Sequence, residues 1–239
     1  MIIRLRALFR DLGTCASLLY FADRLLSRIF AGKVRIYYYK LELLPVPSKP
    51  LLPLHRGRQF EIREIDIPDA ALKMIPRPPE VILSRYKQGS RCIGAFKNDV
   101  LVGQLWIQPD NYQEDEVRCH FILRPMNKVA WDYDVYIDPS LRSTFLFARL
   151  WDFAFGILRE EGIEWSASRI SVWNTASLNS HASLGSQAAG RALFITIGSF
   201  QAMLSNLWPL FHLSFSSKHT PKLRILAPTK SPIESGQRK

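Results

Sequence analysis

Hydrophobic and polar residues alternate with two distinct periods along this chain, and the two periods predict different elements. A period of two predicts strands at residues 33–43, 60–67, 91–96, 100–107, 116–123, 129–137 and 168–173, with a final strand or strand-to-helix junction at 190–200. A period near 3.6, or an opening proline, predicts helices at residues 68–75, 79–88, 144–161 and 175–184. This order predicts an α+β fold with a mixed, mostly antiparallel twisted sheet flanked by helices.

The strongest helical signal covers residues 144–161. Its apolar residues recur three and four positions apart, whereas Arg149 and Asp152 fall on other faces. Gly162 follows directly, and glycine adopts the left-handed conformation that closes many helices. This segment is expected to cover one face of the sheet.

The first thirty residues are also apolar at helical spacing, but charged residues interrupt them. The longest uncharged run, residues 12–22, is too short to cross a hydrocarbon layer of about 30 Å. Residues 2–31 therefore predict one or two amphipathic helices with a basic polar side. Two alternatives follow: residues 1–31 lie in an anionic membrane surface, or they pack on their own domain or on a second subunit.

Composition shifts divide the chain into three regions. Three consecutive tyrosines in residues 33–43 favour a partly exposed sheet edge, and four prolines between Pro45 and Pro53 favour a linker. The predicted regions are a basic N-terminal extension with helix, strand and linker (1–58), a central domain (59–213) and a basic C-terminal tail (214–239).

The formal net charge of +11 lies at the two ends. Residues 1–58 hold eleven Lys and Arg against three acids, and residues 216–239 hold six against one, while the middle is slightly acidic. Basic termini of this kind are expected to meet phosphates, and lipid is favoured because no nucleic-acid motif is present. Nucleic acid is not an expected partner.

Residue types also exclude several chemistries. Three cysteines without CxxC spacing and five scattered histidines give no disulfide framework and no metal site. A cytoplasmic location is expected, with the inner face of the cytoplasmic membrane as the alternative. Residues 192–217 carry no charge, but the polar residues among them argue against a membrane span.

Two stretches carry the candidate chemistry. The first, Val135-Tyr-Ile-Asp-Pro-Ser-Leu-Arg142, runs into the 144–161 helix, and the second is Asn174-Thr-Ala-Ser-Leu-Asn-Ser-His-Ala-Ser-Leu-Gly185. In order and spacing they resemble the acyl-coenzyme A binding half of the GNAT N-acetyltransferases, a resemblance that spans about residues 59–200. The family's two loop glycines are replaced by Phe145 and Phe147.

The resemblance implies a binding site for acetyl-CoA or another acyl-CoA. In the family, backbone N–H groups at a helix N-terminus hold the pyrophosphate, which suits the helix dipole. The second stretch is expected to orient the pantetheine arm. The alternatives are a plain strand–turn–helix with a buried aromatic pair and a simple N-cap at Asn174. The expected cofactor-binding residues are Val135, Ile137, Arg142, Ser143, Thr144, Phe145, Leu146, Phe147, Asn174 and Ser177.

Catalytic candidates come from the same stretches. His181 occupies the family position that protonates the departing thiolate, and imidazole suits general-acid work. Alternation along 129–137 places Asp132, Asp134 and Tyr136 on one face, so Asp134 is the first candidate base and Asp132 the second, with Glu116 and His120 in reserve. The alternative for these acids is a solvent-facing edge or a salt bridge to Arg118.

The predicted function is acyl-CoA-dependent acyl transfer of a bacterial type, as in an N-acetyltransferase, made directly to an amine or sugar acceptor. The alternative is a catalytically degenerate GNAT-like binding or scaffold module at a membrane surface. Expected partners are acyl-CoA, a small-molecule or sugar acceptor, an anionic membrane surface at residues 1–31, and a second copy in a homodimer. No metal is expected.

Overall fold

The computed structural model describes residues 12–53, 55–109, 111–216 and 218–229. Its contacts divide the chain into two compact units, each built from separate stretches of sequence. Unit 1 holds residues 1–44, 112–124 and 167–227, and unit 2 holds residues 45–111, 125–166 and 228–239. These boundaries differ from the three regions that composition indicated, because segments far apart in the sequence pair within each unit.

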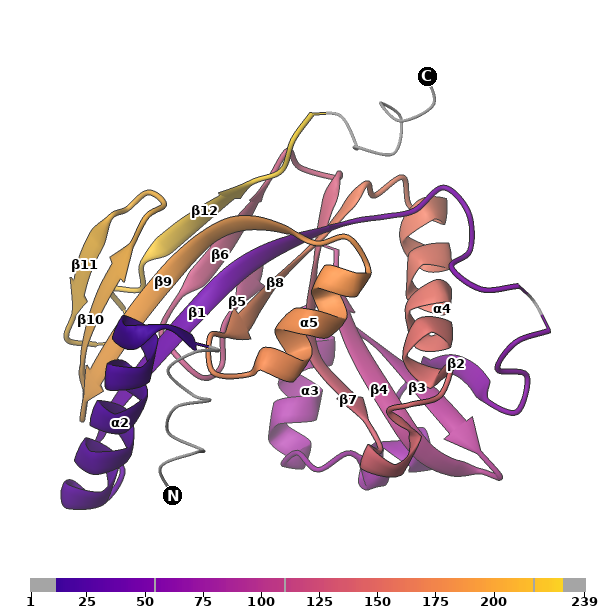
Figure 1. Ribbon diagram of the computed structural model, residues 1–239, viewed down its shortest axis with the longest axis horizontal. Coiled ribbons are helices and arrows are strands. Elements are labelled where there is room, and N and C mark those ends of the chain that lie inside the picture. The colour runs from indigo at the N-terminus through magenta and orange to yellow at the C-terminus, as the bar shows by residue number, and fades with distance from the viewer. Residues whose placement is uncertain (1–11, 54, 110, 217, 230–239) are drawn as a thin grey trace. The chain divides into compact units, whose positions relative to one another are not determined.

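Unit 1 contains a run of strands in the order β11-β10-β9-β1-β8 (Figure 1). The long strand β1 pairs antiparallel with β9, which continues through hairpins into β10 and β11. The bounds are β1 (Val34–Pro45), β8 (Trp165–Ser171, of which residues 167–171 lie in unit 1), β9 (Gln187–Ile197), β10 (Phe200–Ser205) and β11 (Phe211–Ser214).

The expectation that the three tyrosines of β1 mark a sheet edge is wrong. β1 is an interior strand between β9 and β8, and Tyr39 is buried. Its main partner, β9, begins more than 140 residues later in the chain. No local pattern announces a pairing between strands so distant, and an aromatic-rich strand suits an interior position as well as an edge.

A second sheet in unit 1 has the order β12-β6-β5, with bounds β5 (Tyr112–Gln113), β6 (His120–Arg124) and β12 (Lys222–Leu226). β12 runs parallel to β6. This strand lies in the segment that the sequence indicated as a basic tail. Its alternating pattern buries Leu223 and Ile225 and exposes Lys222 and Arg224.

Helix α2 (Thr14–Ile29) packs on unit 1 through specific polar contacts. The buried Asp23 carboxylate accepts the backbone N–H of Ile36 at 2.8 Å and the Nε of Arg35 at 3.1 Å. Trp173 Nε1 donates to the carbonyl of Ala16 at 3.0 Å. The part of the predicted amphipathic region before residue 12 lies outside the described residues. Within the described ranges, no helix has the length and apolarity needed to cross a membrane.

Unit 2 contains four strands in the order β7-β4-β3-β2, all antiparallel. Helix α4 contacts all four strands (Figure 1). The predicted α+β fold with a mostly antiparallel sheet is therefore confirmed. The bounds are β2 (Glu61–Ile65), η1 (Ala70–Met74), α3 (Pro79–Lys87), β3 (Arg91–Lys97), β4 (Val100–Gln108), β7 (Val129–Ile137), η2 (Pro139–Leu141) and α4 (Leu146–Glu160).

The prediction of a helix over 144–161 is confirmed by α4, and its apolar stripe forms part of the core. Leu150, Trp151 and Ala154 are fully buried. Gly162 has a φ of 72°, and the N–H of Ile163 bonds the carbonyl of Leu158. The helix therefore ends where the sequence indicated, through the left-handed cap that glycine permits.

Candidate functional site

The predicted site residues fall into two groups. Asp132, Asp134, Val135 and Ile137 on β7, together with the segment 142–147, belong to unit 2. Asn174, Ser177 and His181 belong to unit 1, on helix α5 (Thr175–Ser183) and its N-cap. Each group is described by itself.

The N-terminus of α4 presents backbone N–H groups without acceptors. Phe145 is the N-cap and makes no side-chain cap. The Thr144 hydroxyl accepts the N–H of Leu146 at 3.3 Å, whereas no described residue accepts the N–H groups of Phe147 and Ala148. Unpaired N–H groups and the helix dipole make such an end attractive to anions.

Two guanidinium groups lie near this helix end. Arg56 stands over the ring of Phe145, 5.1 Å from its centroid. Arg142, three residues before the N-cap, donates from Nε to the carbonyl of Ile137 at 3.3 Å and is exposed. The two loop phenylalanines therefore have partners of their own: Phe145 carries Arg56, and Phe147 packs edge-on against Trp151.

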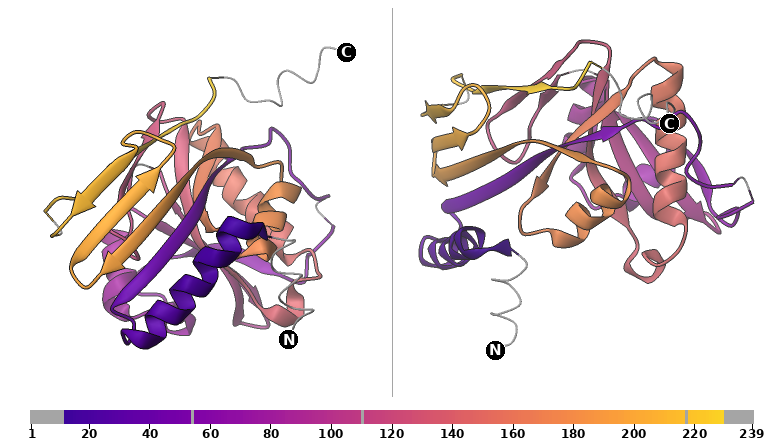
Figure 2. Two further views of the ribbon diagram at one scale, coloured as in Figure 1. Left: turned by 60° about the vertical axis from the view of Figure 1, so that its left-hand side comes forward. Right: turned by 45° about the horizontal axis from the view of Figure 1, so that its top comes forward.

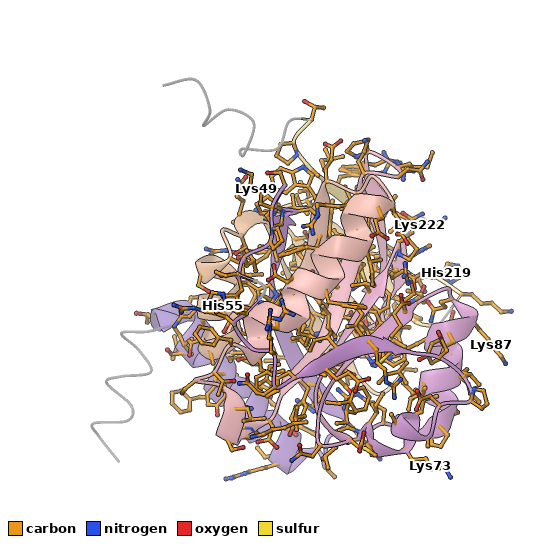
Figure 3. All side chains as sticks on the ribbon, turned by 90° about the vertical axis from the view of Figure 1, so that its right-hand side faces the viewer. Lys49, His55, Lys73, Lys87, His219 and Lys222 are labelled. Carbon is orange, nitrogen blue, oxygen red and sulfur yellow. The ribbon has the colours of Figure 1, made fainter. Side chains whose placement is uncertain are left out.

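Sequence reasoning missed Arg56, because the run His55-Arg-Gly-Arg58 lies in the segment that the prolines marked as a linker. In the structure this segment runs along α4, where Figure 3 labels Lys49 and His55. The buried Asp152 carboxylate accepts the N–H groups of Leu51 at 2.5 Å and Leu52 at 3.1 Å. A carboxylate on α4 thus holds the segment that carries Arg56.

Gly57 explains how this segment approaches α4 so closely. Its φ is 74°, and a Cβ atom built there would lie 2.6 Å from Cγ of Arg149. Only glycine suits both the left-handed backbone and this contact. A shallow cavity of about 240 Å³ lies beside the contact, lined by Pro50, Phe60, Ile62, Arg149, Asp152 and Phe153.

Strand β7 contains a β-bulge at Asp134. Tyr133 pairs with Trp106 and Tyr136 with Gln104, so β7 has one more residue than β4 over this stretch. Asp134 has a φ of 51°, a left-handed conformation that aspartate tolerates better than most residues. The prediction that Asp132, Asp134 and Tyr136 share one face is therefore wrong: the extra residue moves Asp134 and Tyr136 to the face opposite Asp132.

Both carboxylate oxygens of Asp134 accept hydrogen bonds from arginines of unit 2. Arg85 Nη1 lies 2.6 Å from Oδ2, and Arg77 Nη2 lies 2.6 Å from Oδ1. Arg85 is buried, and its guanidinium also contacts the rings of Trp106 and Tyr133 at 5.1 and 4.9 Å. The salt bridge foreseen with Arg118 does not form; the partners come from the helix and loop before β3.

Asp132, the second candidate base, is buried on the other face of β7. Its Oδ2 accepts from the hydroxyl of Ser166 at 2.6 Å.

The two buried cysteine thiols are poor nucleophiles. Burial raises the pKa of Cys92 to about 12 and also raises the pKa of Cys119.

In unit 1, Asn174 caps helix α5. Its Oδ1 accepts the N–H of Ser177 at 3.1 Å, while its Nδ2 has no acceptor among the described residues. His181 is buried, and its Nδ1 lies 2.9 Å from the carbonyl of Ser177. Because a carbonyl only accepts, Nδ1 carries the proton, and in the neutral ring Nε2 then has the lone pair.

Unit 1 also holds a charge cluster around the buried Glu114. Arg169 Nη2 lies 2.7 Å from Glu114 Oε1 and 2.9 Å from Glu116 Oε2, and its guanidinium stacks on the ring of Tyr39. Burial raises the pKa of Glu114, and the neighbouring Arg169 opposes that shift. Glu116, a reserve candidate base, also accepts from the Tyr39 hydroxyl at 2.8 Å. The described part of the chain shows no group of three acids, histidines or cysteines suited to a metal ion.

No family model matches this sequence, and no curated protein matches it significantly. Solved structures do match. A conserved protein of unknown function from Staphylococcus epidermidis is 12% identical over 72% of this chain, with a TM-score of 0.46. One described as a GNAT-family acetyltransferase from Novosphingobium aromaticivorans is 17% identical over 68% of this chain (TM-score 0.47), and a tandem GNAT protein of clavulanic acid biosynthesis is 14% identical over 70% (TM-score 0.47). The chain spans 66, 64 and 56% of their lengths, less than two thirds of each. At these identities the likeness concerns the fold alone.

Proposed function

We propose that this protein is an acyl-CoA-dependent acyltransferase, of the N-acetyltransferase kind, that acts on an amine or a sugar hydroxyl. One observation carries the proposal: the N–H groups of Phe147 and Ala148 are unpaired at the start of α4, and Arg56 and Arg142 lie beside that helix end. This combination suits the pyrophosphate of coenzyme A, because backbone N–H groups and guanidinium forks both bind phosphate oxygens.

The aromatic residues at the loop positions are compatible with this role. The ring of Phe145 makes a cation–π contact with Arg56, and Phe147 packs against Trp151 on the next turn of α4. Gly57 provides a close approach of a different kind, because it lets the segment that carries Arg56 lie against α4.

The proposed reaction is direct. The acceptor nitrogen or oxygen attacks the thioester carbonyl carbon, the carbon–sulfur bond breaks, and coenzyme A leaves as a thiolate that takes up a proton. The acceptor loses one proton to a base, for which Asp134 is the candidate. Arg77, which is half-exposed, occupies one acceptor site of Oδ1, and the second lone pair of that oxygen is the one the acceptor group would approach.

His181 is the candidate acid for the thiolate and Asn174 the candidate ligand of the pantetheine arm. With Nδ1 bound to the Ser177 carbonyl, His181 donates from Nε2 only in its doubly protonated form. The free Nδ2 of Asn174 is suited to a pantetheine carbonyl.

Binding of coenzyme A tests the α4 site. We expect acetyl-CoA to bind the wild-type protein in calorimetry, and Arg56→Met/Arg142→Met to weaken that binding by about 30-fold or more, through the loss of two charge-assisted contacts. Lys87→Met is the matched control, because it removes an exposed positive charge from the same unit. Lys87 lies just before β3, whose first residue pairs with Ile107, whereas the segment before α4 contacts β4 at Val102 through the N–H of Asp138. No binding by the wild-type protein, or equal binding by all three proteins, contradicts the proposal.

A second variant separates a working aromatic turn from a degenerate one. Phe145→Gly/Phe147→Gly restores the family's glycines but removes the ring under Arg56. We expect weaker binding of acetyl-CoA by this variant in the same calorimetric assay. Strongly tightened binding instead indicates a site that has lost its function, and supports the scaffold alternative.

A further inference from the structure

The sheet of unit 1 is apolar on both faces. One face is covered; the other is buried at β1, where Val34 and Ile36 lie opposite Ile197 and Ile195, and is exposed toward β10 and β11. Residues that lie opposite each other in antiparallel strands share a face. Gln201 and Ser214 lie on the covered face, where Arg118 bonds both. Met203 shares that face and is fully buried.

The other face is named here the outer sheet face, and it consists of Leu193, Ile195, Ile197, Leu204, Phe211 and Leu213. Ile197, Leu204, Phe211 and Leu213 are between 43 and 53% exposed. A solvated face of an antiparallel sheet is normally polar. Contiguous exposed apolar side chains of this size mark an interaction site.

The turn between β10 and β11 extends this surface. It carries Trp208, which is 70% exposed, and Leu210, which is 56% exposed. Phe215, just after β11, packs at a tilt against Phe200 with 5.2 Å between ring centroids and is also exposed. Tryptophan at an exposed apolar tip is typical of side chains that sit at the boundary between water and lipid.

The charges around the outer sheet face are of one sign. The sequence contains no Asp or Glu between Glu164 and Glu234. Arg191 and Lys218, which flank the uncharged stretch of β9 to β11, are both exposed. An apolar patch flanked along the chain by cations matches a surface that combines apolar depth with negative charge.

Helix α2 repeats this arrangement beside β1 (Figures 1 and 2). Leu18, Leu25 and Ile29 are exposed on the side of the helix away from the buried residues of α2. Arg24 and Arg28 are exposed next to them. The acids of the described segments before and within β1, Asp23 and Glu42, are both buried and leave no exposed negative charge there.

The geometry points to an anionic lipid bilayer as the occupant of the outer sheet face, with the β10–β11 turn entering the headgroup region. A second copy fits less well, because a two-fold interface places each surface against itself and would bring cations together without an acid to pair them. Nucleic acid fits less well because its phosphates do not need exposed aliphatic side chains. The lipid phosphates would meet Arg191, Lys218 and the arginines of α2.

Vesicle sedimentation of the full chain tests this inference. The wild-type protein is expected to sediment with vesicles of phosphatidylcholine and phosphatidylglycerol, and much less with phosphatidylcholine alone. Leu204→Ser/Phe211→Ser is expected to lower the partition coefficient on the mixed vesicles by roughly tenfold or more, since it removes two inserting side chains. Thermal unfolding confirms that the variant is folded.

The matched control is Val100→Ser/Met126→Ser, which polarises two exposed apolar residues of unit 2 and is expected to sediment like the wild-type protein. Equal sedimentation of both variants overturns the inference. The inference is also overturned if the wild-type protein is a dimer in sedimentation equilibrium without vesicles and Leu204→Ser/Phe211→Ser is a monomer. The outer sheet face is then a contact between copies of this chain.

Discussion

Replacing Arg169 with methionine is expected to lower the free energy of unfolding by roughly 3 to 5 kcal/mol, the usual cost of removing one partner from a buried ion pair. Arg169 is the cation that Glu114 and Glu116 share. Glu114 is almost fully buried, so in the variant its carboxylate keeps the cost of desolvation without the compensating charge. Urea unfolding followed by fluorescence measures the change.

The loss is expected to depend on pH. Burial already raises the pKa of Glu114 in the folded protein, and removing Arg169 removes the interaction that lowers it. The folded variant then binds a proton more tightly than the unfolded chain does, so its free energy of unfolding falls as pH rises above the ordinary glutamate range. The deficit relative to the wild-type protein should therefore be larger at neutral pH than at mildly acidic pH.

Arg191→Met is the control for this experiment, since Arg191 is an exposed cation on β9 of the same unit. It is expected to change the free energy of unfolding by about 1 kcal/mol or less. A deficit in Arg169→Met no larger than that of the control, or one that grows as pH is lowered, contradicts the account of a buried, charge-paired Glu114.

Arg85→Met is expected to be the second large effect, at roughly 3 kcal/mol of lost stability. Arg85 is buried, bonds Asp134 at 2.6 Å and contacts the rings of both Trp106 and Tyr133. Its loss leaves the bulge at Asp134 with only the half-exposed Arg77. Acyl transfer should fall as well, because the candidate base loses the group that holds it.

A cycle of variants separates charge from packing at this position. Asp134→Asn keeps a residue that tolerates the left-handed backbone, so Arg85→Met/Asp134→Asn should recover part of the stability lost in Arg85→Met. Arg77→Met is expected to cost about 1 kcal/mol or less in the same unfolding assay, since this arginine is half-exposed. If Arg77→Met proves as costly as Arg85→Met, burial of Arg85 is not the cause.

Local patterns were sufficient for the elements with short-range signals. The periodicity of 144–161 and Gly162 predicted α4 and its end, because both depend on contacts within one helix. Asn174 was recognised as an N-cap for the same reason: the cap joins residues three apart. The strands at 91–96 and 100–107 also followed from local alternation, and they form the antiparallel pair β3 and β4.

Long-range pairing was beyond those patterns. β1 was expected at an edge and lies inside the sheet, so a chain that began near Gln59 would lack an interior strand of unit 1. The bulge at Asp134 depends on the register between β4 and β7, and one extra residue moved that side chain to the opposite face. Arg56 reached α4 only because Asp152 holds the preceding segment.

The sequence by itself determined the α+β class, the position and end of α4, the helix N-terminus as the candidate anion site and the uncharged stretch before the C-terminal cations. The tertiary structure decided that Arg56 lies at that helix end and which arginines form ion pairs with Asp134. It also decided that the uncharged stretch forms an exposed apolar sheet face. The physical reason is range. Helix periodicity and capping act over a few residues, whereas ion pairing, register and exposure depend on groups that only folding brings together.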